Sequence, residues 1–217
     1  MGVDTVLVAG GTGGLGTAVV ERLKTDGWRV VVADRRGDAD CVVDLFSLDG
    51  ARSAVETAVA DPGKPLRAVV NLVGGYASGG LVHETPVDDF EEQLRLNLRP
   101  AYLLAHVAMP HLVAAGGGSF VCVSSRAAVR PFAGAAGYVT AKAAVLAFVD
   151  ALAVEYRDSG VRANAVLPSV IDTPANRASM PSVRGVPPAD IAAVVAFLCS
   201  VGSAVTSGAH IPVYGSA

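Results

Sequence analysis

Short apolar runs alternate along this chain with longer segments in which apolar residues recur at helical spacing. The apolar runs predict strands over Thr5–Ala9, Arg29–Ala33, Ala68–Leu72, Ser119–Val123, Arg162–Leu167 and Ala209–Val213. The helical patterns predict helices over Leu15–Thr25, Leu48–Val59, Pro86–Ala115, Val139–Ser159 and Pro188–Val201. Because the strands are apolar on both faces, we predict an α/β fold, a Rossmann-type doubly wound parallel sheet with helices on both faces.

Segments rich in glycine and proline separate these elements and predict loops over Gly74–Gly80, Ala114–Gly118 and Pro174–Pro188. No repeat, linker or low-complexity stretch interrupts residues 1–217, so we expect a single domain. Ligands bind at the carboxyl ends of strands in such folds. The short segment at about 174–188 is therefore the expected substrate loop.

Composition narrows the classes of protein. The mean hydropathy is +0.47, yet no apolar run approaches the roughly 18–20 residues of a membrane span, and no secretory signal is expected. A net charge of −3 without a basic stripe argues against nucleic-acid partners. Neither the histidines nor the isolated cysteines have the spacing of metal ligands, so we expect no metal site. The three cysteines are expected to be buried, reduced thiols in a cytoplasmic protein: Cys41, Cys122 and Cys199.

A glycine-rich segment joins the first predicted strand to the first helix. Gly10 permits a tight turn, Gly14 lets a pyrophosphate approach the backbone, and Gly16 lets the helix pack closely on the sheet. The helix N-terminus at Leu15 presents free N–H groups to phosphates. A merely flexible loop is the alternative, but the strand–loop–helix context favours dinucleotide binding.

The second strand ends in an acidic residue followed by two basic ones. Asp34 lies about twenty positions after the glycine loop, where a carboxylate binds the adenosine ribose hydroxyls. A carboxylate there repels a 2′-phosphate and favours NAD(H). Arg35 and Arg36 could instead hold that phosphate, so NADP(H) stays possible.

A tyrosine and a lysine share one face of the predicted helix in the stretch GYVTAKAA. Tyr138 and Lys142 lie one helical turn apart. A nearby ammonium group lowers the pKa of a phenol, which would prepare Tyr138 to transfer a proton at a carbonyl or alcohol.

Together these motifs resemble the short-chain dehydrogenase/reductase family over nearly the whole chain. The resemblance rests on the glycine loop, Asn71–Gly74, Ser125 after its strand, Tyr138 with Lys142, and the terminal SGAHIPVYG. It implies a catalytic set of Asn97, Ser125, Tyr138 and Lys142. It also implies cofactor contacts from Gly10, Thr12, Gly13, Gly14, Leu15, Gly16, Asp34, Arg35, Asp44, Leu45, Asn71, Gly74, Tyr138, Lys142, Pro168 and Thr173.

The resemblance further implies a role for each reacting group. Tyr138 would exchange the proton, Lys142 would tune Tyr138 and hold the nicotinamide ribose, Ser125 would bind the substrate oxygen, and Asn97 would hold a relay water. The sequence departs from the family pattern at Ala9, Leu72, Val73 and Ser169, where no reacting group is lost.

The expected function is NAD(P)(H)-dependent interconversion of a ketone or aldehyde and an alcohol. Partial resemblance of the segment LPSVIDTPANRASMP to the dihydropteridine reductase branch leaves reduction of a quinonoid or pterin ring as an alternative. A non-catalytic dinucleotide sensor is another. Candidate pocket residues are Tyr76, Arg126, Phe132, Asn176, Arg177 and Met180. The long apolar helices also predict a homodimer or homotetramer.

Overall fold

Seven parallel strands form one sheet in the computed structural model, which describes residues 3–77 and 79–215. The strand order is β3-β2-β1-β4-β5-β6-β7. The strands are β1 (Thr5–Ala9), β2 (Arg29–Asp34), β3 (Cys41–Val42), β4 (Leu66–Asn71), β5 (Gly118–Val123), β6 (Val161–Pro168) and β7 (His210–Val213). The order reverses between β1 and β4, which is where a doubly wound sheet opens a crevice for ligands. Ser78, within the predicted loop Gly74–Gly80, lies outside the described residues.

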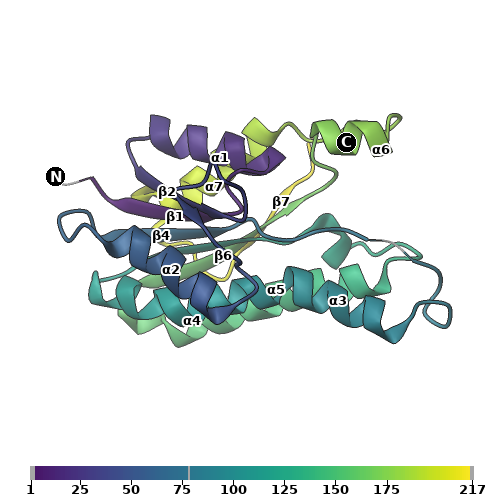
Figure 1. The fold of residues 1–217 in the computed structure, drawn as a ribbon, viewed down its shortest axis with the longest axis horizontal. Coiled ribbons are helices and arrows are strands. Elements are labelled where there is room, and N and C mark those ends of the chain that lie inside the picture. Colours follow the sequence, from purple (N-terminus) through teal and green to yellow (C-terminus); the bar gives the residue numbers. More distant parts are fainter. Residues whose placement is uncertain (1–2, 78, 216–217) are drawn as a thin grey trace.

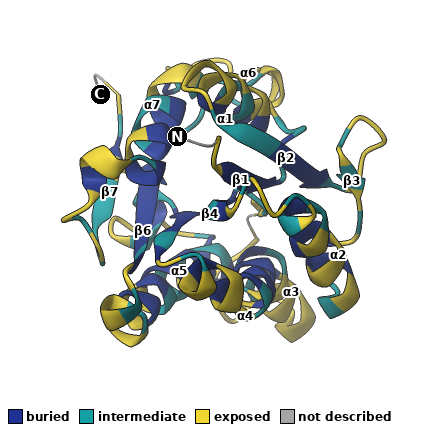
Figure 2. Ribbon diagram, turned by 90° about the vertical axis from the view of Figure 1, so that its left-hand side faces the viewer, coloured by how far each residue is buried: buried dark blue, intermediate teal, exposed yellow. Residues whose placement is uncertain are grey.

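Helices cover both faces of the sheet (Figure 1, Figure 2). One layer contains α1 (Gly14–Thr25), α6 (Pro174–Ser179) and α7 (Pro188–Cys199). The other contains α2 (Leu48–Val59), α3 (Val87–Asn97), α4 (Arg99–Ala114) and α5 (Ala136–Glu155). The doubly wound α/β architecture predicted from the hydrophobic pattern is confirmed.

Successive side chains of each strand point to opposite faces of the sheet, so the core has two halves, one on each face. On β1, Val6 and Val8 pack toward α1 and α7, whereas Leu7 and Ala9 pack toward α2, α4 and α5. All four side chains are fully buried, which is why the strand sequence shows no polar alternation.

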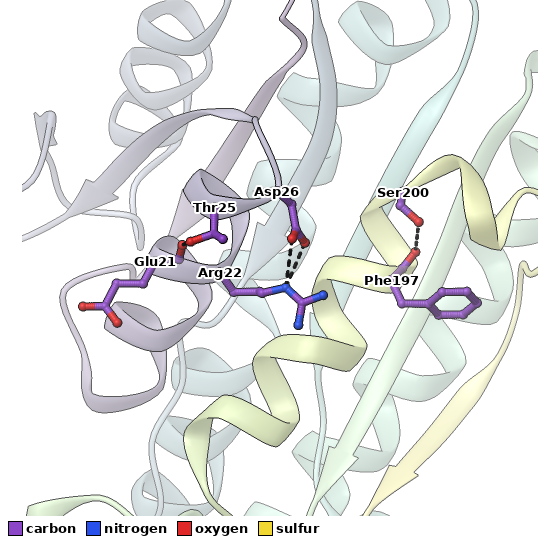
Figure 3. Close-up of polar contacts among 6 residues, drawn as sticks. All are labelled: Glu21, Arg22, Thr25, Asp26, Phe197 and Ser200. Carbon is purple, nitrogen blue, oxygen red and sulfur yellow. Dashed lines mark hydrogen bonds and ion pairs between the residues drawn. The ribbon is translucent and has the colours of Figure 1, made fainter.

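The far ends of α1 and α7 show how the polar groups at the helix ends are satisfied (Figure 3). Arg22 Nε donates to both carboxylate oxygens of Asp26 at 3.1 and 2.9 Å, one turn along α1. At the end of α7, Ser200 Oγ donates to the Phe197 carbonyl at 2.8 Å. These exposed contacts add little to stability. They lie where the two helices end, on the side of the sheet opposite the glycine loop.

The sequence predicted one continuous helix over Pro86–Ala115, and this prediction is wrong. The chain forms α3 and α4 with a break at Leu98, whose backbone angles are φ −102° and ψ −43°. Pro100 has no N–H to donate to the carbonyl four residues earlier, and the Asn97 side chain bonds the Gln93 carbonyl at 3.1 Å. The break fixes where Asn97 lies.

Three smaller expectations also need correction. The segment Pro174–Pro188 is not wholly loop, because Thr173 Oγ1 accepts from the Asn176 N–H and caps the short helix α6. The two-residue strand β3 was not predicted, since its pattern is too short to detect. Cys41, on that edge strand, is only partly buried, whereas Cys122 and Cys199 are fully enclosed.

Helix α5 corrects the statement that no apolar segment approaches the length of a membrane span. It is long and apolar enough to cross a bilayer by length and composition, with a mean hydropathy of 1.6 over its most apolar window. Its inner face packs on β6 and it carries the buried Lys142. These contacts identify α5 as a core helix beside the sheet.

Candidate active site

The loops that follow four neighbouring strands converge at one end of the sheet. Strands β1, β4, β5 and β6 are in parallel register and end at Ala9, Asn71, Val123 and Pro168. Figure 1 shows α6 above this end of the sheet and α3 below it. The residues predicted for the cofactor and for catalysis therefore lie at one edge, between two helix layers.

The glycine loop has the backbone shape that a dinucleotide requires. Gly10 has φ +81°, a conformation that side chains rarely allow. A Cβ on Gly16 would lie 2.4 Å from the Gly10 carbonyl oxygen. No side chain caps the N-terminus of α1 at Gly13, so its first N–H groups point toward the crevice. This uncapped cradle fits a pyrophosphate.

Thr173 closes the other side of this cradle. A Cβ on Gly14 would lie 2.8 Å from the Thr173 methyl carbon, so the start of α6 touches the glycine loop. Pro168 is buried at the end of β6, at the base of the same segment. The segment predicted to hold the nicotinamide thus lies across from the phosphate cradle.

Asp34 binds the glycine loop itself. Its Oδ2 accepts from Thr12 N–H at 3.2 Å and from Thr12 Oγ1 at 2.7 Å, while Oδ1 accepts from Arg35 N–H at 2.7 Å. Burial raises the pKa of Asp34, but these bonds and the charge of Arg36 outweigh it and lower the pKa. The carboxylate is therefore charged, and it orders the loop as well as facing the expected ribose position.

The residues predicted to line the adenine and the cofactor crevice differ in how far their side chains are exposed. Asp44 is exposed, and its Oδ1 accepts from the Phe46 N–H at 3.0 Å. The Leu45 side chain is buried in the core, so only its backbone can face a ligand. Asn71 is buried and its Oδ1 accepts from the Val73 N–H at 3.2 Å, which shapes the loop after β4.

Lys142 is a buried amine at the centre of the site. Its Nζ donates to the Val123 carbonyl at 3.0 Å and lies 5.9 Å from the centre of the Tyr138 ring. Ser124 Oγ donates to the Lys142 carbonyl at 2.7 Å and fixes this turn of α5 against β5. Burial lowers the pKa of Lys142 to about 8. One hydrogen bond leaves two of its N–H groups able to bind a ribose.

Tyr138 lies in the first turn of α5, where Ala136 begins the helix. Burial raises the pKa of its phenol, and the Ser125 hydroxyl lowers it only in part. The prediction that Lys142 lowers this pKa is wrong, because burial dominates and raises it. Tyr138 is therefore a protonated phenol at neutral pH, the form that donates a proton to a carbonyl oxygen.

Ser125 lies two residues after the end of β5 and caps a short helical turn. Its Oγ accepts from the Ala127 N–H at 3.1 Å. With the oxygen already accepting, the hydroxyl proton is available to a substrate oxygen or to Tyr138. The predicted pair of hydroxyl groups is thus brought together from the loop after β5 and from α5.

Asn97 uses its side chain to hold the loop after β4. Its Oδ1 accepts from the Gly75 N–H at 3.1 Å. A Cβ on Gly74 would lie 2.7 Å from this oxygen and 3.1 Å from Lys142 Nζ. Gly74 therefore lets the Asn97 and Lys142 side chains both approach the backbone at this point, a reason for this glycine that the sequence alone did not reveal.

Four of the six predicted pocket residues divide into two groups. Tyr76 and Phe132 are half-exposed aromatic residues beside the site, and the Tyr76 ring lies edge-on at 5.0 Å from Tyr138. Asn176 and Arg177 are bound locally, by the Ile171 carbonyl and the Asp172 carboxylate. The aromatic residues therefore form the better-placed wall for a substrate.

Two further site residues escaped the sequence reasoning. Ser124 and Gln93 are both buried polar residues, in the loop after β5 and on α3. Gln93 precedes Asn97 by one helical turn and packs beneath Gly137, next to Tyr138. A polar residue on the inward face of an amphipathic helix was the signal that could have identified Gln93.

Comparison with known proteins gives consistent matches. The family model described as "short chain dehydrogenase" matches residues 4–183. A 4-formylbenzenesulfonate dehydrogenase from Comamonas testosteroni is 33% identical over 244 aligned positions, which cover 98% of this chain and 96% of the relative.

Solved structures match equally well. A short-chain type dehydrogenase/reductase from Mycobacterium ulcerans is 26% identical with a TM-score of 0.91, over 99% of this chain and 90% of that one. A 3-ketoacyl-(acyl-carrier-protein) reductase from Brucella melitensis, complexed with NADH, is 26% identical with a TM-score of 0.87, over 98% and 97%. The partial likeness to dihydropteridine reductases stays a prediction.

Proposed function

This chain belongs to the short-chain dehydrogenase/reductase family, and we propose that Tyr138 is its general acid/base in the interconversion of a carbonyl compound and an alcohol. The protein is an oxidoreductase that uses a nicotinamide dinucleotide. The observation that carries the proposal is the meeting of Tyr138, Ser125 and buried Lys142 opposite the uncapped N-terminus of α1. We treat residues 1–217 as one dinucleotide-binding oxidoreductase domain, with its substrate segment at about 174–188.

The reaction needs a proton at the carbonyl oxygen and a hydride at the carbonyl carbon. Ser125 donates a hydrogen bond to the substrate oxygen and aligns it with the Tyr138 hydroxyl. Tyr138 donates its proton to that oxygen as negative charge develops there. Lys142, a buried cation, stabilises the phenolate that remains. When bound, the dinucleotide supplies or accepts the hydride.

Cofactor binding is divided among the residues of the crevice. The N–H groups at the start of α1, with Gly10, Gly13, Gly14, Leu15 and Gly16, hold the pyrophosphate. Thr12 and Arg35 order the Asp34 carboxylate for the adenosine ribose. Lys142 holds the nicotinamide ribose, and Thr173 borders the nicotinamide. Backbone atoms of Asp44, Leu45, Asn71 and Gly74 line the remaining crevice.

The test of this function is turnover. Purified protein is incubated with NADH or NADPH and a panel of aldehydes, ketones, quinones and pterins, and oxidation of the reduced nicotinamide is followed by absorbance. We expect reduction of at least one carbonyl compound. Tight cofactor binding without turnover of any compound in the panel would instead support a dinucleotide sensor.

We propose NAD(H) as the preferred cofactor because the charged Asp34 carboxylate repels a 2′-phosphate. Asp34→Asn should shift the ratio of kcat/KM for NADH to that for NADPH toward NADPH by about ten- to a hundredfold, equivalent to roughly 1.4–3 kcal/mol. The ratio is measured with one carbonyl substrate. Arg36→Ala is the companion variant, since Arg36 Nη1 lies 3.4 Å from the Thr12 carbonyl oxygen and could hold the phosphate. An unchanged ratio in Asp34→Asn would contradict the assignment.

We also propose self-association through the outer faces of α4 and α5. Tyr102 is 54% exposed and packs against Phe148 of α5 at 6.0 Å between ring centres, and Val154 is also exposed. An apolar face of this kind is typical of a subunit interface. Light scattering at micromolar concentration should give a dimer or tetramer, and Tyr102→Asp should shift it toward the monomer. A monomeric wild type would refute the proposal.

The remaining expectations concern the cellular setting. We propose a cytoplasmic location, which suits a chain whose Cys122 and Cys199 thiols are buried and reduced. The expected partners are a small carbonyl or alcohol substrate and further copies of this chain, with no role for nucleic acid or a membrane.

A further inference from the structure

The segment in which β5 ends contacts Lys142 at both its amine and its backbone. The Val123 carbonyl accepts from Lys142 Nζ at 3.0 Å, and Ser124 Oγ donates to the Lys142 backbone carbonyl at 2.7 Å. The next residue, Ser125, shares a hydrogen bond with the Tyr138 hydroxyl. Three consecutive residues therefore contact one buried lysine and the proposed proton donor one helical turn away from it.

This three-residue segment is itself held by the sheet. The Ser124 N–H donates to the Val166 carbonyl of β6 at 2.9 Å, so the pairing of the two strands continues beyond the end of β5. Helix α5 packs on the same strand β6 through apolar side chains. Apolar packing has no preferred direction, whereas a hydrogen bond has one. The Ser124 bond can therefore fix the position of α5 along the sheet more closely than packing alone.

Burial gives the Ser124 hydroxyl group a free-energy cost that its hydrogen bond offsets. Ser124 is 3% exposed, and a buried hydroxyl without a partner disfavours the folded state. Alanine would occupy most of the same space without that cost. The Lys142 carbonyl lies inside α5, where helical geometry already pairs it with the N–H four residues later. The Ser124 bond is therefore additional to those of the helix, and its effect is to place the helix rather than to form it.

We propose that Ser124 is a positioning residue for the reaction at Tyr138. Its bond to the Lys142 carbonyl holds the first two turns of α5 at the distance from Ser125 that lets the Tyr138 hydroxyl and the Lys142 ammonium act at one substrate oxygen. The Ser124 hydroxyl is directed at the helix, so it acts through Lys142 and Tyr138 and not on the substrate. The inference rests on the proposed reaction and adds to it a residue outside the reacting set.

Ser124→Ala, compared with a matched serine variant on the same strand, tests the proposal. We expect Ser124→Ala to lower kcat by about tenfold, because a small displacement of the proton donor is costly to the rate, while KM for the carbonyl compound changes little. Ser119→Ala is the control. Ser119 is fully buried on β5, and its Oγ donates to the Leu198 carbonyl of α7 at 2.8 Å, away from the site. An equal fall in kcat in both variants would refute the positioning role.

A second variant separates the hydrogen bond from the space that the side chain fills. In Ser124→Cys the thiol occupies about the same place as the hydroxyl group but is a weak donor. We expect kcat of Ser124→Cys to stay close to that of Ser124→Ala. Wild-type kcat in Ser124→Cys would overturn the proposal, because filling the space would then be enough.

The surroundings of Lys142 allow a further readout that needs no turnover. Burial lowers the pKa of Lys142 to about 8. The titratable groups that face it are the Cys122 thiol and the Tyr138 phenol, and burial raises the pKa of both. From α3 and the loop after β4, the neutral Asn97 amide and the Gly74 backbone face it. Lys142 is therefore the group of this cluster that titrates first as pH rises above neutral.

The free energy of unfolding is measured by denaturant at pH 8 and at pH 10 for the wild type, Ser124→Ala and Ser119→Ala. The folded-state pKa of Lys142 lies below its reference value of 10.5, so stability rises with pH across this window. If Ser124 holds Lys142 in its buried place, the rise should be smaller in Ser124→Ala and of wild-type size in Ser119→Ala. An equal rise in the two variants contradicts the proposal. Failure of the wild type to reduce any compound of the carbonyl panel would count separately, against the proposed reaction.

Discussion

Replacing Tyr138 with phenylalanine is expected to lower kcat by about 10²–10⁴-fold, the usual contribution of a general acid/base. The change removes only the hydroxyl group, while the ring can keep its edge-on contact with Tyr76 at 5.0 Å. The Kd for NADH, measured by fluorescence titration, should change by less than about threefold. Loss of turnover with binding retained is the result expected of a proton donor.

Control variants make this result specific. Tyr156→Phe removes a hydroxyl near the far end of α5 and should leave kcat unchanged. Ser125→Ala should lower kcat less than Tyr138→Phe, because Ser125 aligns the substrate oxygen but does not give up the proton. Wild-type kcat in Tyr138→Phe would exclude the proposed mechanism. If Tyr138→Phe instead lost NADH binding, its role would lie in cofactor contact.

The second large effect is expected at Lys142, where activity and stability should move in opposite directions. Lys142→Met keeps the length and apolar character of the side chain but removes the ammonium group. We expect kcat to fall by about 10²-fold or more, because the phenolate of Tyr138 loses its nearby cation. The Tm should nevertheless rise, since burying the ammonium disfavours the folded state.

The pH dependence follows from the pKa of Lys142. This pKa is about 8 in the folded protein and 10.5 as a reference, so the unfolded chain binds more protons between these two values. The free energy of unfolding should therefore rise with pH across this window, by about 3 kcal/mol from this group alone. Below pH 8 the full cost of burial is present.

Comparison of variants isolates this contribution. Denaturant unfolding is measured at pH 8 and at pH 10 for the wild type, Lys142→Met and Lys24→Met. The gap between the wild type and Lys142→Met should narrow as pH rises. Lys24 is exposed on α1, so its replacement should change neither kcat nor the pH dependence of stability. A Lys142→Met protein less stable than the wild type at pH 8 would show that the amine stabilises the folded state.

Much of the site could be predicted because its chemistry lies in local patterns. A glycine loop works through backbone shape within one turn, so the residues Gly10, Gly14 and Gly16 identify it without tertiary information. Tyr138 and Lys142 share a helix face by their spacing alone. The strand order β3-β2-β1-β4-β5-β6-β7 also agrees with the predicted doubly wound sheet, because apolar strands need helices on both faces.

Other features depended on contacts between distant segments. The break between α3 and α4 results from Pro100 together with the side-chain bond from Asn97 to the Gln93 carbonyl. The role of Gly74 follows from the approach of Asn97 and Lys142 to one point, which no local pattern contains. The pKa of Tyr138 was mispredicted because burial, a property of the folded protein, raises it, and only the Ser125 hydroxyl opposes this rise.

The sequence by itself therefore determined the fold class and the dinucleotide loop and singled out the proposed reacting groups, because each depends on residue types at short spacing. The tertiary structure decided the electrostatic state of those groups and the shape of the space beside them. Burial gives Lys142 its pKa of about 8, and the packing of α3 against α5 buries Gln93 beneath Gly137. Desolvation and enclosure arise only when segments far apart in the chain pack together.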